Sequence, residues 1–224
     1  MSSATDSGIA NSFTDLMTSL MVIFILLLCA FMNNAFEESQ STRTKILEKL
    51  QQQLKEYGEQ GVTVKSDDND PLALLILVPE GLLEFTIDRS EIPEKGALFL
   101  QSFIPKLTNI IYSDEFRNDI SSVVVEGHTD SLGSDNHNLE LSQRRSMAVV
   151  SKSINILEDQ KISSANGSEK KEYFLRVLSA SGRGKQDLYI INGEEDHELS
   201  RRVIFKIRVR SFEEKKIEKF LPNV

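Results

Sequence analysis

Cysteine, glycine and proline are scarce in this sequence of 224 residues. The single cysteine, Cys29, excludes an internal disulfide framework, and 11 Gly with 5 Pro exclude collagen and low-complexity disorder. Basic residues are also in the minority, since 26 Lys and Arg stand against 34 Asp and Glu and give a formal net charge of −8. A surface of this charge does not collect nucleic-acid phosphates, so DNA and RNA are not expected as direct partners. The length allows one full domain with additional segments.

One long apolar run lies near the N-terminus, from Phe13 to Met32. Its 20 residues span about 30 Å as a helix, the thickness of the hydrocarbon core of a bilayer. A cleaved secretory signal is the alternative, but residues 1–12 contain no Lys or Arg to form its basic region. We therefore predict one transmembrane helix over residues 13–34, after a short tail of residues 1–12. The charges that flank the helix do not determine its orientation.

Asp15 lies inside this apolar run, where an ionised carboxylate is costly. Helical spacing places Thr18 and Ser19 on the same stripe as Asp15. Lipid would leave these polar groups unpaired, so the stripe suits contact with another protein helix or with a narrow wet path. Because desolvation favours the neutral carboxyl group, Asp15 could take up a proton from one side of the membrane and release it to the other. The alternative is a helix-capping aspartate among the lipid headgroups.

The segment after the apolar run, residues 35–70, is predicted to form a short helical linker. Four apolar residues recur there at spacings of 3, 4 and 3, namely Leu47, Leu50, Leu54 and Tyr57. Fewer than two heptads cannot hold a coiled coil alone, so the stripe permits pairing of two copies only if their membrane helices already hold them together. A solvated spacer explains the pattern equally well. The acidic run of residues 67–70 and Pro71 mark the entry to a folded domain.

Residues 71–212 are predicted to form an α/β domain, a mixed sandwich with helices on one face of the sheet, followed by a tail of residues 213–224. The apolar patterns predict strands over residues 72–78, 82–87, 123–125, 173–178 and 202–209. They predict helices over residues 94–112, bent or divided at Pro105, and over residues 139–156, with Asn138 as the N-cap.

The strand at residues 123–125 leads directly into Asp130, and Arg145 follows on the next helix. Functional residues are often found at strand ends of this kind. An acid and a guanidinium brought together there could hold the ammonium and the carboxylate of a zwitterionic amino acid. They could equally form an internal salt bridge.

The stretch from Val123 to Val150 resembles the peptidoglycan-binding signature of the OmpA-like C-terminal domain family. The residues in register are Gly127, Thr129, Asp130, Gly133, Asn138, Leu141, Ser142 and Arg145. SASGRGKQ at residues 179–186 and SRRVIFKI at residues 200–207 resemble the glycine-rich turn and the last strand of the same family. The resemblance implies that Asp130 and Arg145 hold the diaminopimelate of the cell-wall stem peptide. It implies further contacts from Thr129, Asn138, Leu141 and Arg202.

Neither a metal site nor an enzyme is expected. His128 and His137 with Asp130 match no standard metal-ligand spacing. Ser131 is not set in a nucleophile-elbow pattern, which argues against a Ser-His-Asp triad. The sequence therefore predicts no cofactor and no metal ion.

The order of the parts adds a second resemblance. One transmembrane helix with an aspartate near its end, followed by an OmpA-like domain, is similar to the B subunits of ion-driven stators, such as MotB-type subunits of the flagellar motor. Asp15 corresponds to their proton-carrying aspartate. The chain lacks the basic tail and the tryptophan-containing run of the flagellar pattern, and its short N-terminus looks more like ZorB-type subunits of the Zorya anti-phage defence system.

This second resemblance implies partners and a location. We expect a homodimer inside a pentameric ring of multi-pass A subunits in the inner membrane, with the N-terminus in the cytoplasm and the wall-binding domain in the periplasm. A proton is the expected ion because a lone carboxylate suffices for it, although Thr18 and Ser19 leave sodium open. The alternatives are a flagellar stator subunit and a passive wall anchor whose helix only tethers.

Overall fold

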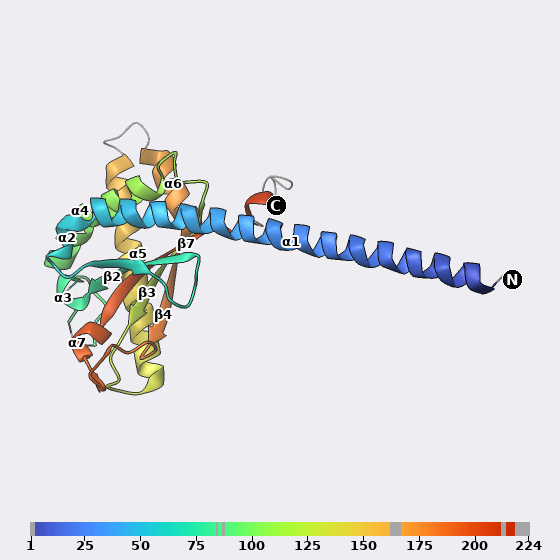
Figure 1. The fold of residues 1–224 in the computed structure, drawn as a ribbon. Helices are drawn as coiled ribbons and strands as arrows, with labels where there is room; N and C mark the ends of the chain where they lie inside the picture. The colour runs from blue at the N-terminus through green and yellow to red at the C-terminus, as the bar shows by residue number, and fades with distance from the viewer. Residues whose placement is uncertain (1–2, 84, 87, 162–166, 212–213, 218–224) are drawn as a thin grey trace.

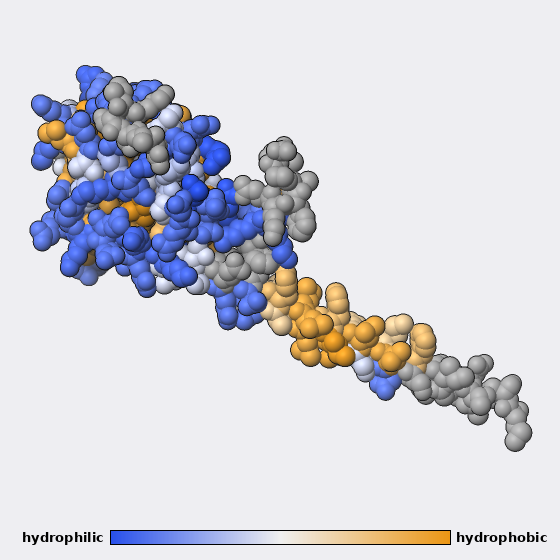
Figure 2. Space-filling model, turned by 90° about the horizontal axis from the view of Figure 1, so that it is seen from above, coloured by the Kyte–Doolittle hydropathy of each residue, from blue (hydrophilic) through white to orange (hydrophobic). Residues whose placement is uncertain are grey.

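The N-terminal part of the chain is one long helix. The computed structural model describes residues 3–83, 85–86, 88–161, 167–211 and 214–217. Helix α1 (Ser3–Gln53) runs for 51 residues and projects from a packed domain (Figure 1). Its segment Phe13–Asn34 is long and apolar enough to cross a membrane, by criteria of length and composition that an N-terminal signal sequence also meets. Figure 2 shows this segment as a hydrophobic band outside the polar surface of the domain.

A five-stranded sheet forms the centre of the domain, with the strands in the order β1-β2-β7-β3-β4. Neighbouring strands are antiparallel except β3 and β4, which are parallel. Phe205 pairs with Ile76 on one side and with Val125 on the other, and all three are buried on the face that carries the core. The strands are β1 (Thr63–Ser66), β2 (Ala73–Pro79), β3 (Ile120–His128), β4 (Leu178–Gly184) and β7 (Arg202–Val209).

Helices cover that face of the sheet, so the predicted α/β sandwich is confirmed. The three long ones are α4 (Glu94–Ile111), α5 (Asp135–Lys161) and α6 (Gly167–Val177). Phe103, Phe174 and Phe205 are among the largest fully buried side chains of a single apolar cluster that joins helices and sheet. Three short helices and a hairpin complete the domain, namely α2 (Lys55–Gly58), α3 (Glu80–Leu83), α7 (His197–Ser200), β5 (Ile190–Ile191) and β6 (Glu194–Glu195).

The stripe that was predicted as a spacer or a pairing seam belongs to the core of its own domain. Leu50 is 0% exposed, Leu54 is 2% exposed, and Leu47 is partly buried against the same apolar cluster, which also includes the neighbouring Ile46. The ring of Tyr57 packs edge-on against Phe99 and Phe103 of α4, with a centroid distance of 5.7 Å to each. The packed unit therefore begins well before the predicted boundary at residue 71, and β1 lies inside the predicted linker.

Two predicted strands are wrong. Residues 80–83 of the expected strand 82–87 form α3, and residues 84 and 87 lie outside the described residues. Residues 173–177 of the expected strand 173–178 are the end of α6, and Leu178 begins β4. Tyr173, Phe174 and Val177 are buried at spacings of 1 and 3, which place them on one face of a helix.

Two helices also differ from the prediction. Pro105 lies inside α4 and does not divide it. Helix α5 begins at Asp135, so Asn138 lies in its first turn, where its backbone N–H donates to Ser134 O at 2.9 Å. The Ser134 hydroxyl accepts from the His137 N–H at 3.3 Å and takes the capping position instead.

Candidate functional site

An open cleft of about 1020 Å³ lies where three parts of the chain meet at one end of the sheet. They are the end of β2 with α3, the end of β3 with the start of α5, and the α7 segment before β7. In Figure 1, α3 and α7 lie at the side of the domain turned away from the N-terminal half of α1. The cleft is lined by Glu80, Gly81, Phe85, Asp88, Thr129, Asp130, Leu132, Gly133, Ser134, His137, Asn138, Leu141, Arg145, Glu198 and Arg201.

Close approach of β3 to α5 brings the two predicted ligand residues to the same cleft. A Cβ atom on Gly127 would lie 2.2 Å from the backbone oxygen of Ser142, so only glycine allows the strand to sit this near the helix. The N–H of Thr129 donates to Gly184 O at 2.8 Å and fixes the chain as it leaves β3. Asp130 and Arg145 are thereby placed in one site, as the sequence predicts.

Asp130 is held by contacts with its own loop and with the segment before β7. Its Oδ1 accepts from the Leu132 N–H at 3.2 Å, and its Oδ2 accepts from Nη1 of Arg201 at 2.8 Å. The ring Nδ1 of His197 lies 3.7 Å from the same Oδ2. The side chain is 10% exposed, so the carboxylate is fixed in orientation but still reachable from the cleft.

Arg145 is more deeply buried, with a side chain 6% exposed. It donates through Nε to Arg89 O at 3.1 Å and through Nη2 to Thr86 O at 3.3 Å, and its guanidinium lies 4.9 Å from the centre of the Phe85 ring. Its Nη1 pairs with Oε1 of Glu80 at 2.7 Å. Burial lowers the pKa of Arg145, and the charge of Glu80 opposes this effect. The guanidinium is therefore a charged group in a fixed orientation.

Glu80 and Arg201 connect these two groups. The second carboxylate oxygen of Glu80 accepts from Nε of Arg201, so acids and bases alternate in the order Asp130, Arg201, Glu80, Arg145. Burial acts to lower the pKa of Arg201, but the hydrogen bonds with Asp130 and Glu80 raise it overall. Among the described residues no ion pair joins Asp130 to Arg145 directly, so the internal salt bridge considered from the sequence is not formed.

Three of the four additional predicted contacts line the cleft. Thr129, Asn138 and Leu141 are all buried at its floor. Asn138 donates to Leu132 O at 2.8 Å and so shapes the loop beside Asp130.

Arg202 does not line the cleft, and the neighbouring Arg201 takes the place expected of it. Arg202 shares strand parity with Lys206, on the face opposite the core, and its guanidinium donates to Ser200 O at 3.0 Å and to Asp187 O at 2.7 Å. Burial lowers its pKa. Arg201 directly precedes β7 in an extended conformation, and the alternation of side chains along the strand separates the two arginines once the burial of Val203 shows which face is the core.

Sequence reasoning also missed the residues that the loop before α4 contributes. Phe85 stacks on Arg145, and Asp88 accepts a hydrogen bond from His137 at 2.9 Å. Asp88 has a φ of 56°, a left-handed conformation that aspartate tolerates better than most residues. These residues were missed because a strand was expected over residues 82–87.

The two histidines considered as metal ligands lie apart. The ring of His128 is buried and contacts Gln186 O at 3.1 Å, whereas His137 contacts Asp88. Within the described residues, no group of three or more His, Cys, Asp or Glu side chains is arranged to hold a metal ion.

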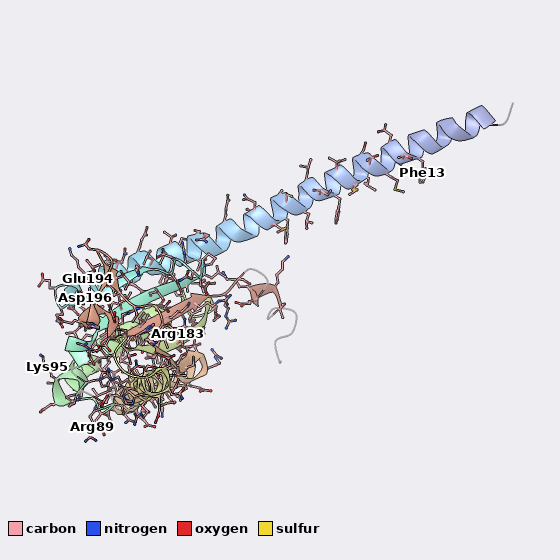
Figure 3. The ribbon with its side chains drawn as sticks, turned by 90° about the horizontal axis from the view of Figure 1, so that it is seen from below. Phe13, Arg89, Lys95, Arg183, Glu194 and Asp196 are labelled. Atoms are coloured by element: carbon pink, nitrogen blue, oxygen red, sulfur yellow. The ribbon has the colours of Figure 1, made fainter. Side chains whose placement is uncertain are left out.

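Asp15, the aspartate of the apolar helix, is remote from the cleft. Asp15, Thr18 and Ser19 are exposed on α1. Figure 3 shows the nearby Phe13 far from Arg89, whose carbonyl accepts a hydrogen bond from Arg145. The Thr18 hydroxyl donates to Thr14 O of its own helix. No hydrogen bond or ion pair of the Asp15 side chain occurs within the described part of the chain.

Most residues of the cleft fall within the match to a known family. A model of the OmpA family matches residues 85–202, more than half of the chain. The chain belongs to the OmpA family. The match covers most of the cleft, including Asp130, Asn138, Arg145 and Arg201, while Glu80 lies outside it.

Relatives extend the similarity to the N-terminal helix. The chain is 27% identical over 212 residues to the Zorya protein ZorB of Escherichia coli ATCC 8739, which covers 88% of this chain and 86% of the relative. It is 25% identical over 214 residues to the Zorya protein ZorB of Escherichia coli O139:H28, covering 92% of this chain and 82% of the relative. A putative MotB-like protein from Desulfovibrio vulgaris has the same fold, with a TM-score of 0.54 and 18% identity over 79% of this chain and 96% of that chain.

Proposed function

We propose that this chain is the peptidoglycan-anchored B subunit of a proton-driven stator complex in the inner membrane, of the Zorya anti-phage type. The observation that carries the proposal is one chain in which an OmpA family cleft with Asp130 and Arg145 follows an apolar helix with Asp15. The similarity to two ZorB proteins along about 90% of the chain supports the Zorya assignment over a flagellar one.

The cleft suits the zwitterionic end of diaminopimelate in the wall stem peptide. Asp130 accepts hydrogen bonds from the ammonium, and Arg145 donates to the carboxylate, since charge-assisted hydrogen bonds of this kind are strong and directional. Thr129, Asn138 and Leu141 shape the floor, and Arg201 replaces Arg202 among the contacts. Four acids that line the cleft, Glu80, Asp88, Asp130 and Glu198, favour a ligand that brings an ammonium group.

The position of the cleft fits an anchor that reaches away from the membrane. The elements that flank it lie on the side of the domain turned away from the N-terminal half of α1. With Phe13–Asn34 in the inner membrane, the domain lies in the periplasm with its cleft toward the wall, and the N-terminus lies in the cytoplasm.

The membrane aspartate carries the ion. Two copies of the chain stand inside a pentameric ring of multi-pass A subunits, whose helices surround the Asp15 stripe. A proton from the periplasm neutralises Asp15, the fit between the helices changes, and the ring advances. One elementary charge moved across the membrane yields about 2.3 kcal/mol per 100 mV, which is enough to bias a packing change when several transfers are coupled. Binding of the domain to peptidoglycan keeps the B subunits from turning with the ring.

Two separate assays test the two ends of the chain. The full chain in detergent is expected to sediment with purified peptidoglycan sacculi, and Asp130→Asn and Arg145→Gln are expected to abolish this binding. Glu140→Gln, which removes an exposed charge outside the cleft, is the matched control. Retention of all three variants by sacculi would contradict the wall-binding assignment.

The motor assignment is tested with Asp15→Asn. In cells that express the complete system, this variant is expected to assemble with the multi-pass partner and to bind sacculi, but to lose protection in a phage plaque assay. A passive tether would protect as well as the unaltered chain, and that result would contradict the stator proposal.

A further inference from the structure

Glu80 stands between the two arginines of the cleft, and beyond its share in the negative charge of the lining it has no direct ligand contact in the proposal above. One carboxylate oxygen pairs with Arg145 and the other with Arg201, and the side chain is only 14% exposed. Its position is set by the sheet, because it follows the last residue of β2, and its N–H donates to Arg201 O at 3.3 Å. Glu80 is therefore in place before any ligand arrives.

The two arginines of the cleft need a negatively charged residue between them. Two guanidinium groups repel each other, and the charge of Arg201 acts to lower the pKa of Arg145. Without Glu80, Asp130 would be the one carboxylate left among these four side chains. Electrostatic attraction would then draw both Arg145 and Arg201 toward Asp130. A direct pair of Asp130 with Arg145 would neutralise the two groups that a zwitterionic ligand needs.

We propose that Glu80 is a positioning residue that keeps Arg145 apart from Asp130, so that the cleft presents a separate acid and base to the ligand. This inference rests on the proposed wall-binding function. Alternation in the order Asp130, Arg201, Glu80, Arg145 leaves an acid at one end and a guanidinium at the other. Arg145 is held by Glu80 on one side and by the carbonyls of Thr86 and Arg89 on the other, which leaves two of its five N–H groups for a carboxylate.

The binding test compares Glu80→Gln with Glu140→Gln in the full chain in detergent, with a diaminopimelate-containing muropeptide as the probe. Both changes remove one negative charge, but only the first removes the partner of Arg145. We expect about a tenfold loss of affinity for Glu80→Gln and none for Glu140→Gln. With a muropeptide whose diaminopimelate carboxylate is amidated, the loss should shrink, because Glu80 acts through the contact of Arg145 with that carboxylate. A purely structural defect would weaken both ligands alike.

A structure of the ligand-free Glu80→Gln chain gives the second measurement. It is expected to show the Arg145 guanidinium within ion-pair distance of Asp130, and Glu80→Ala gives the same test if the glutamine amide still holds one arginine. Unchanged muropeptide binding by Glu80→Gln, together with loss in Asp130→Asn, would overturn the role of Glu80 and leave wall binding standing. If the unaltered chain does not bind peptidoglycan, the proposed function is wrong. The position of Arg145 in the variant structure still decides whether Glu80 keeps Arg145 apart from Asp130.

Discussion

Both halves of α1 carry apolar side chains, but the surroundings of these side chains are opposite. In the N-terminal half, Leu26 and Leu27 are 63% and 65% exposed, whereas in the C-terminal half Ile46 and Leu50 are 0% exposed. The C-terminal half completes the core of its own domain, and the N-terminal half has no such core to enter. Apolar surface of that extent is costly in water, so its environment must come from lipid or from another chain.

The two aspartates to which we assign functions, Asp15 and Asp130, differ in the same way. Asp130 has its partners within the chain, from Arg201 to the N–H of Leu132. The Asp15 carboxylate has no partner within the described residues and can find one only in another subunit or in water. A carboxylate held in one orientation suits a ligand-binding site. A carboxylate that meets partners only outside its own chain suits a contact that changes.

Replacing one leucine in each half should give the largest contrast. Leu50→Ala removes a fully buried side chain, and we expect it to lower the free energy of unfolding by about 2 to 5 kcal/mol. Leu26→Ala removes an exposed side chain and should leave the unfolding of the domain unchanged. Denaturant unfolding of the detergent-solubilised chain, followed by circular dichroism, measures both. Equal losses would show that the two halves are not separate in the way described.

The second prediction concerns how the domain assembles its cleft. Gly127→Ala places a Cβ against the backbone of Ser142, and we expect α5 to shift at a cost of about 1 to 3 kcal/mol. Because Arg145 is carried by α5, binding to sacculi should fall together with stability. Gly193→Ala is the control for space, since nothing lies within 4 Å of its Cβ position, although its φ of 88° adds some backbone strain. Wild-type stability and binding for Gly127→Ala would contradict the close approach of β3 to α5.

The sequence predicts much of this contrast, and the failures have physical causes. The apolar run at residues 13–34, the sheet with helices on one face and the meeting of Asp130 with Arg145 follow from pattern and resemblance. The stripe from Leu47 to Tyr57 was misjudged because a short helical stripe does not reveal what covers it, whether solvent, a second copy or its own domain. The strand expected at residues 173–178 was wrong because short apolar runs fit a helix and a strand equally well.

The charges of the cleft were the hardest part to predict. Glu80 lies 50 residues before Asp130, and nothing in the local sequence of either marks them as members of one array. Arg201 directly precedes β7 and Arg202 is its first residue, so the choice between them depends on the direction in which each side chain leaves the extended backbone. Strand parity holds that information, but it becomes useful only after the core face is known.

The smallest expected effect is a pH dependence confined to the domain. Burial raises the pKa of Tyr173 to about 12, above the unfolded value of about 10. The neutral phenol is thus the form that the fold favours, so its contribution is fully present below about pH 10 and declines as the pH rises toward 12. Tyr173→Phe loses the hydrogen bond to Arg117 O, at a cost of about 1 kcal/mol. Between pH 10 and 12, however, this variant should lose less further stability than the unaltered chain does.

Tyr189→Phe, at an exposed position, controls for the general effect of alkali. Parallel pH profiles for Tyr173→Phe and Tyr189→Phe would show that the Tyr173 phenol ionises freely in the folded domain, against the burial that the structure gives it.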